Sequence, residues 1–162
     1  MRGHLLDCNH VEAYCRDEPS VVQKLGTIPA EWPLRVCAIT LGEIDAGHLM
    51  TQTTDQTKRD KYIDCVTREF LPYALVISRN TRLYYARIIG NLWKSHPPAS
   101  AKKGTEQHLL DLRVDVNDVW TVASAWEHNL TLVTHDQMQC IRDAVGSSVR
   151  FDCWLPPAGH TH

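Results

Sequence analysis

The clearest pattern of hydrophobic and polar positions lies between residues 115 and 136. Apolar side chains recur there at the i, i+3, i+4, i+7 spacing of one buried helical face, namely Val119, Val122, Ala123 and Trp126. Asn117 is a suitable N-cap for this helix, and Asn129 is a suitable end. Residues 130–133 then form a short apolar run that predicts a strand, with Asp136 just beyond it.

Short apolar runs alternate with amphipathic segments along the rest of the chain. Further strands are predicted at residues 5–6, 35–39, 74–77 and 149–154, and helices at residues 9–15, 19–25, 55–71, 83–93 and 138–145, with another helix capped by Thr40. This alternation predicts a three-layer α/β/α sandwich around a mainly parallel sheet of about five strands. We expect one domain over residues 1–155 and an unstructured tail over residues 156–162.

Composition fits a globular protein of one domain. The 162 residues are 43% hydrophobic and 22% charged, and no apolar run approaches the length of a membrane span. The first residues lack the apolar region of a signal peptide, so we expect a cytoplasmic protein. No two of the six cysteines have the spacing of about two to four residues that is typical of zinc sites. We therefore expect reduced thiols, most of them in the core.

Four acidic residues are placed where predicted elements begin or end. Asp7, Glu43 and Asp136 follow predicted strands, and Asp118 begins the helix that leads into residues 130–133. Because parallel strands present their carboxyl ends at one edge of a sheet, these side chains are expected to meet there. Each acid also has a structural alternative as a helix cap, and Glu43 with Thr40 fits a capping box.

A cluster of four carboxylates has a chemical implication that a single acid lacks. The negative charges repel one another unless a hard cation neutralises them, and Mg²⁺ and Mn²⁺ prefer oxygen ligands. An all-oxygen site that leaves room for water suits hydrolysis at phosphorus. The pattern therefore indicates a Mg²⁺- or Mn²⁺-dependent hydrolase.

At this point the sequence resembles the PIN-domain ribonucleases, and specifically the VapC toxins of toxin-antitoxin pairs. The resemblance rests on four ordered motifs: Leu5-Leu6-Asp7-Cys8-Asn9, Ile39-Thr40-Leu41-Gly42-Glu43, Asn117-Asp118 with Ala123 and Ala125, and Leu132-Val133-Thr134-His135-Asp136. It implies that Asp7, Glu43, Asp118 and Asp136 bind the metal and are catalytic, and that Asn9 and Thr134 support them. Cys8, where threonine is frequent, and the long loop over residues 94–107 depart from the usual pattern.

The resemblance implies an activity and its partners. The activity is metal-dependent endoribonuclease cleavage of a structured RNA, the inhibitor is a VapB-like antitoxin, and the assembly is a homodimer with no membrane partner. Two alternatives stay open on the sequence: a catalytically silent PIN-like module that binds nucleic acid or protein, and a receiver domain that accepts a phosphoryl group. The receiver domain lacks support, because its paired acids after the first strand and its late lysine are missing.

Net charge permits an RNA partner. The chain carries −2 overall, which becomes +2 once the four site carboxylates are set aside. Basic side chains that are candidates for RNA binding are Arg79, Arg82, Arg87, Lys94, Lys102 and Lys103. Each of these is equally compatible with an ordinary solvated surface.

Overall fold

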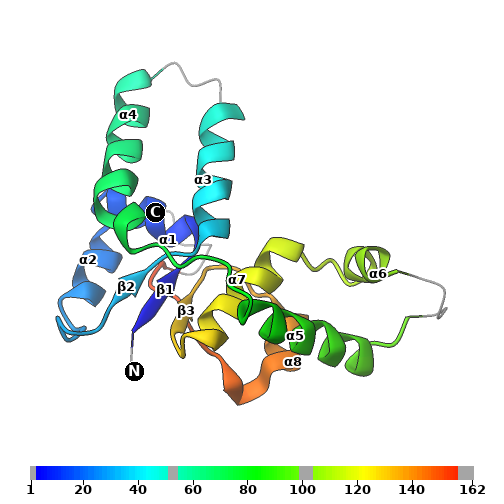
Figure 1. Ribbon diagram of the computed structural model, residues 1–162. Helices are drawn as coiled ribbons and strands as arrows, with labels where there is room; N and C mark the ends of the chain where they lie inside the picture. The colour runs from blue at the N-terminus through cyan, green and yellow to red at the C-terminus, as the bar shows by residue number, and fades with distance from the viewer. Residues whose placement is uncertain (1–2, 51–54, 99–103, 157–162) are drawn as a thin grey trace.

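The computed structural model describes residues 3–50, 55–98 and 104–156, which fold into three layers (Figure 1). Within these residues the middle layer is a sheet of four parallel strands in the order β2-β1-β3-β4. The strands are β1 (His4–Leu6), β2 (Leu34–Arg35), β3 (Thr131–Val133) and β4 (Arg150–Asp152). The predicted α/β/α architecture is confirmed.

Helices make up the outer layers. They are α1 (Cys8–Cys15), α2 (Pro19–Leu25), α3 (Ala38–Met50), α4 (Gln56–Cys65), α5 (Thr81–Ser95), α6 (Thr105–Asp111), α7 (Val116–Glu127) and α8 (Gln139–Val145). A π-helical segment η1 (Val66–Phe70) and two short 3₁₀ turns, η2 (Leu71–Tyr73) and η3 (Gly146–Ser148), complete the set. None of the helices in the described ranges combines the length and apolar character needed to cross a bilayer.

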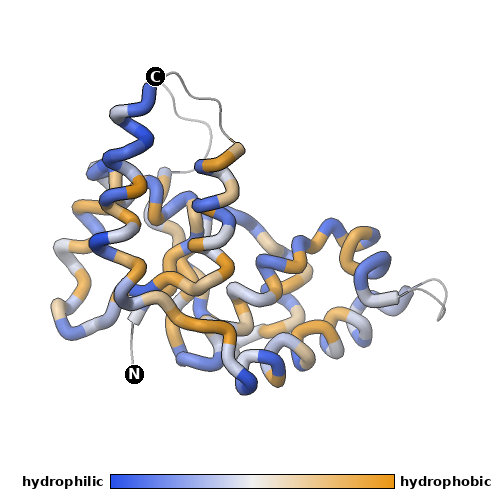
Figure 2. Tube along the Cα trace, turned by 45° about the horizontal axis from the view of Figure 1, so that its top comes forward, coloured by the Kyte–Doolittle hydropathy of each residue, from blue (hydrophilic) through white to orange (hydrophobic). Residues whose placement is uncertain are grey.

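The period-two alternation of the strands builds the two halves of the core. Leu5 and Leu132 point to one face of the sheet and pack in a cluster with side chains of α5, α7 and α8, among them Ile88, Val122 and Ile141. Leu6 and Val133 point to the other face and pack with Val11, Val21 and Phe70 of α1, α2 and η1. Apolar and hydrophilic stretches alternate along the helices, and α4 is hydrophilic where it begins (Figure 2).

The predicted fifth strand is reduced to a single bridge. Of residues 74–77 only Leu75 pairs, through a parallel bridge to Cys37. The Leu75 amide nitrogen lies 2.8 Å from the Val36 carbonyl oxygen, and the Ala38 amide nitrogen lies 2.8 Å from the Leu75 carbonyl oxygen. Because the chain turns into α3 at Ala38, the strand predicted over residues 35–39 ends early and leaves one partner. Of the tail predicted over residues 156–162, all but residue 156 lies outside the described residues.

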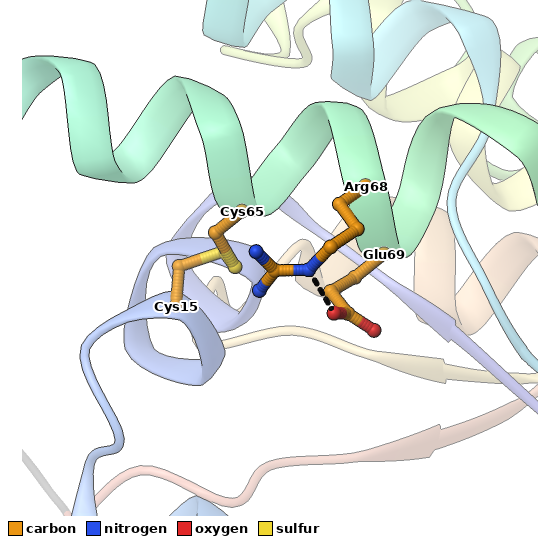
Figure 3. The surroundings of a disulfide bond; sticks show 4 residues. All are labelled: Cys15, Cys65, Arg68 and Glu69. Carbon is orange, nitrogen blue, oxygen red and sulfur yellow. Dashed lines mark hydrogen bonds and ion pairs between the residues drawn. A yellow bond between two sulfur atoms is a disulfide. The ribbon is translucent and has the colours of Figure 1, made fainter.

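The expectation that the cysteines are reduced is wrong for one pair. Cys15 at the end of α1 forms a disulfide with Cys65 at the end of α4, and the bond spans 50 residues of sequence (Figure 3). Beside the disulfide, on η1, Arg68 forms an ion pair with Glu69, in which Arg68 Nε lies 2.7 Å from Glu69 Oε1. The disulfide fastens α4 to the first helix after β1. Sequence spacing missed it because the contact depends on how α4 folds back over α1.

Candidate active site

The carboxyl edge of the sheet gathers the chain segments that carry the predicted acids. Asp7 comes directly after β1 and is the N-cap of α1. Its backbone nitrogen lies 3.1 Å from the Val133 carbonyl oxygen of β3, so the segment Thr134-His135-Asp136 leaves the sheet beside it. The parallel register, with Leu6 opposite Val133, is what brings these two strand ends together.

Asp7 is buried and held by several donors. Its Oδ1 accepts from the His10 backbone nitrogen at 3.0 Å and lies 2.8 Å from His10 Nδ1, and its Oδ2 lies 3.3 Å from the His135 backbone nitrogen. Burial opposes ionisation of Asp7, but the hydrogen bonds from His10 and from the Thr134 hydroxyl outweigh burial and lower the pKa. Asp7 is therefore a carboxylate near neutral pH.

Glu43 lies one turn deeper in its helix than the sequence predicts. Helix α3 begins at Ala38, so Thr40 is a buried residue inside the helix and the predicted capping box is wrong. Glu43 instead accepts at both oxygens: Oε1 lies 2.9 Å from Asn117 Nδ2, and Oε2 lies 3.3 Å from Cys8 Sγ. Burial and the nearby Glu43 raise the pKa of Cys8, which keeps the thiol protonated and able to donate.

Asp115, rather than Asn117, is the N-cap of α7. The Asp115 carboxylate accepts from the Asn117 backbone nitrogen at 2.8 Å, and the helix begins at Val116. The Asn117 side chain is thus released from the capping role predicted for it and reaches Glu43 across the site. Asp118 follows in the first turn, as predicted, where the helix dipole favours an acid.

The pKa of Asp118 indicates that other acids lie near it. Burial, followed by the charges of Asp115, Asp136, Glu43 and Asp7, raises the pKa of Asp118 to about 7. The other three predicted acids therefore all lie within electrostatic reach of Asp118. In the described part of the chain no three His, Cys, Asp or Glu side chains are close enough to hold a metal ion as they stand. Donors from His10, Asn117 and Cys8 hold the side chains of Asp7 and Glu43 in this arrangement.

The other predicted residues fall in different surroundings. Thr134 is buried and contacts Asp7, whereas Asn9 is exposed on α1. The basic candidates Arg79, Arg82, Arg87 and Lys94 are exposed on or next to α5, and Lys102 and Lys103 lie outside the described residues. Their role in RNA binding stays a prediction.

A groove of about 880 Å³ opens beside the acids, between α1, α3 and α4. Cys8 and Glu43 are among its lining residues, and its basic side chains are Arg16, Lys58, Arg59 and Lys61. Arg16 pairs with Glu12, Lys58 pairs with Asp55 at 3.2 Å, and Arg59 Nε lies 2.8 Å from His48 Nδ1. Sequence reasoning missed this basic surface, because α4 is brought to α1 only by the fold and the disulfide.

Comparisons with known proteins identify the fold of this chain. No protein-family model matches the sequence, and no curated protein matches it significantly. Solved structures do match. One is a chain in the crystal structure of VapBC2 from Rickettsia felis bound to a promoter DNA fragment. The alignment covers 96% of this chain and 100% of that chain, with a TM-score of 0.67 and 15% identity. The chain has the fold of the VapC PIN domains. At such identity the likeness concerns the fold.

Two further solved structures align almost as fully. FitAcB from Neisseria gonorrhoeae covers 92% of this chain and 96% of its own at 21% identity and a TM-score of 0.64. VapBC-1 from nontypeable Haemophilus influenzae covers 95% and 98% at 19% identity and the same TM-score. The predicted PIN-like fold is confirmed, and its carboxyl edge is where Asp7, Glu43, Asp118 and Asp136 approach one another.

Proposed function

We propose that the chain is a metal-dependent endoribonuclease of the VapC type, with Asp7, Glu43, Asp118 and Asp136 as its catalytic acids. The observation that carries the proposal is the arrangement at the carboxyl edge, where Asp7 follows β1 beside the end of β3 and Asn117, next to Asp118, donates to Glu43. The raised pKa of Asp118, caused by burial and by the neighbouring carboxylates, agrees with it. A protein retains such mutual repulsion at a cost in stability, and functional sites are where such costs concentrate.

The donor set fits Mg²⁺ or Mn²⁺. All four side chains offer carboxylate oxygens, and the neighbouring Asn117 and Thr134 offer further polar atoms. At such a site a bound divalent ion supplies activation of water and stabilisation of charge on a phosphate. Asp7, already ionised, would contribute a full negative charge, whereas Asp118 would release its proton as the ion binds.

The groove between α1, α3 and α4 supports RNA as the substrate. Glu43 lines it together with four basic side chains, of which Arg16 and Lys58 pair with acids of the same groove. A phosphate backbone lying in it would meet these basic side chains and Glu43. Arginine and lysine contacts of this kind bind phosphate without reading sequence. This surface adds to the predicted basic residues on α5.

An antitoxin partner and self-association are part of the same proposal. The solved structures with this fold include complexes named VapBC and FitAB, some of them bound to DNA. We infer that an antitoxin encoded next to this chain covers its acids, and that two copies associate. Co-expression with the adjacent gene and measurement of the mass of the purified complex test both inferences.

Cleavage of RNA by purified protein tests the activity. We expect fragments with Mg²⁺ or Mn²⁺, none with EDTA, and loss of at least about a hundredfold in rate for Asp7→Asn and Asp118→Asn. Asp45→Asn, an exposed acid on α3, is the matched control and should cleave like the wild type. Equal cleavage by all variants would reject the proposal. Divalent metal binding without any cleavage would instead support the silent binding module.

A further inference from the structure

His10 is fully buried between the first catalytic acid and the end of the last strand. Its exposed fraction is 0%, and its ring lies edge-on to the Trp154 indole, with 6.1 Å between the ring centroids. His10 Nε2 lies 3.1 Å from the Trp154 backbone nitrogen, and His10 Nδ1 lies 2.8 Å from Asp7 Oδ1. The imidazole therefore bridges the chain after β4 to Asp7.

The contact with Trp154 fixes which ring nitrogen of His10 carries the proton. A backbone N–H can only donate, so Nε2 must accept from Trp154 and has no hydrogen of its own. The remaining ring proton then sits on Nδ1 and is donated to Asp7 Oδ1. The hydrogen-bond partners of the His10 ring therefore determine its tautomer.

Two donors on Oδ1 add to the contacts of the Thr134 hydroxyl and the His135 backbone nitrogen in orienting the Asp7 carboxylate. Oδ1 accepts from the His10 backbone nitrogen, as expected of an N-cap, and from His10 Nδ1 as well. An N-cap bond alone leaves a carboxylate free to rock about its last torsion, whereas the second donor restrains it. Oδ2, which has a longer contact of 3.3 Å with the His135 backbone nitrogen, keeps lone pairs for a cation.

We infer that His10 is a positioning residue that presents Asp7 Oδ2 to a divalent ion, and that the segment at Trp154 sets the orientation of His10. The inference rests on the proposed function. Trp154 is itself anchored, because its indole nitrogen lies 2.9 Å from Asp152 Oδ2 at the end of β4. A chain of contacts thus runs from β4 through Trp154 and His10 to Asp7.

Substitution of His10 separates positioning from packing. His10→Leu fills a similar volume without a donor, whereas the amide nitrogen of His10→Asn can occupy the place of Nδ1. His108→Leu is the matched control, since His108 is also a buried helical histidine but lies on α6, where its ring contacts Trp93 of α5. Urea unfolding of each variant measures the structural cost.

The decisive readout is the dependence on Mn²⁺, measured by calorimetric binding and by RNA cleavage. We expect His10→Leu to weaken Mn²⁺ binding about tenfold or more, with cleavage restored at saturating Mn²⁺. His10→Asn should recover most of the affinity, and His108→Leu should bind like the wild type. Unchanged affinity in His10→Leu, or equal loss in His10→Asn and His10→Leu, would overturn the inference.

Failure of the proposed function gives a different result. Wild-type protein that binds Mn²⁺ but cleaves no RNA rejects the ribonuclease, and the calorimetric comparison then decides the role of His10 alone. Wild-type protein that binds no Mn²⁺ rejects both.

Discussion

Asp118→Asn should make the metal-free protein more stable at high pH. Burial and neighbouring acids raise the pKa of Asp118 to about 7, against an ordinary value near 4. The folded chain then keeps a proton on Asp118 that the unfolded chain releases near pH 4. The contribution of Asp118 to stability is therefore fully present below about pH 4 and is lost as the pH rises towards 7.

The magnitude follows from the size of the pKa shift. About 1.4 kcal/mol per pKa unit gives about 4 kcal/mol for full burial, and the partial exposure of Asp118 reduces this to about 2 kcal/mol through solvent screening. Asn is neutral at every pH, so Asp118→Asn should gain about 2 kcal/mol relative to the wild type between low and high pH.

Urea unfolding in EDTA near pH 4 and near pH 8 measures this difference. Asp45→Asn removes an exposed charge from α3 and should show no such pH-dependent gain. Added Mn²⁺ should stabilise the wild type at the higher pH and leave Asp118→Asn almost unchanged. Wild type and Asp118→Asn with the same pH dependence would refute the reasoning that the acids converge on Asp118.

Two further predictions concern stability away from the acids. Reduction of the Cys15–Cys65 disulfide should lower the free energy of unfolding by at most about 4 kcal/mol, since the bond closes a loop of 50 residues. Urea unfolding of Cys15→Ser should not change when reductant is added. Wild-type protein whose urea unfolding is equally insensitive to reductant would contradict the bond. Gly3→Ala should destabilise the fold by about 1–3 kcal/mol, because an added Cβ would lie 2.8 Å from Pro33 atoms. Gly90→Ala in α5 meets open space and should stabilise the fold by up to about 1 kcal/mol. Equal changes of the unfolding temperature in the two variants would argue against this packing.

Local patterns were sufficient to predict the elements that build the sheet edge. Short apolar runs identified residues 5–6 and 130–133 as strands, and Pro19–Leu25 forms the predicted helix with the same bounds. The i, i+3, i+4 spacing identified the buried face of α7. These predictions succeeded because each depends on residues that are close in sequence and on burial of one face.

Contacts between distant segments could not be predicted in this way. Asn117 is a plausible N-cap by type, yet the neighbouring Asp115 takes that role, and Asn117 donates to Glu43, 74 residues away. A partial signal for His10 did exist: its spacing of three from Asp7 puts both on one side of a first helical turn, within reach of each other. The contribution of Trp154 to that contact depends on the completed sheet.

Direct binding of Mn²⁺ to the RNA-free protein tests most directly whether the four acids form one metal site. Calorimetric titration should detect Mn²⁺ binding to the wild type and to Asp45→Asn, with proton release as Asp118 ionises. Asp7→Asn and Asp118→Asn should each bind at least about tenfold more weakly. Equal Mn²⁺ affinity in the wild type and both site variants would contradict the account.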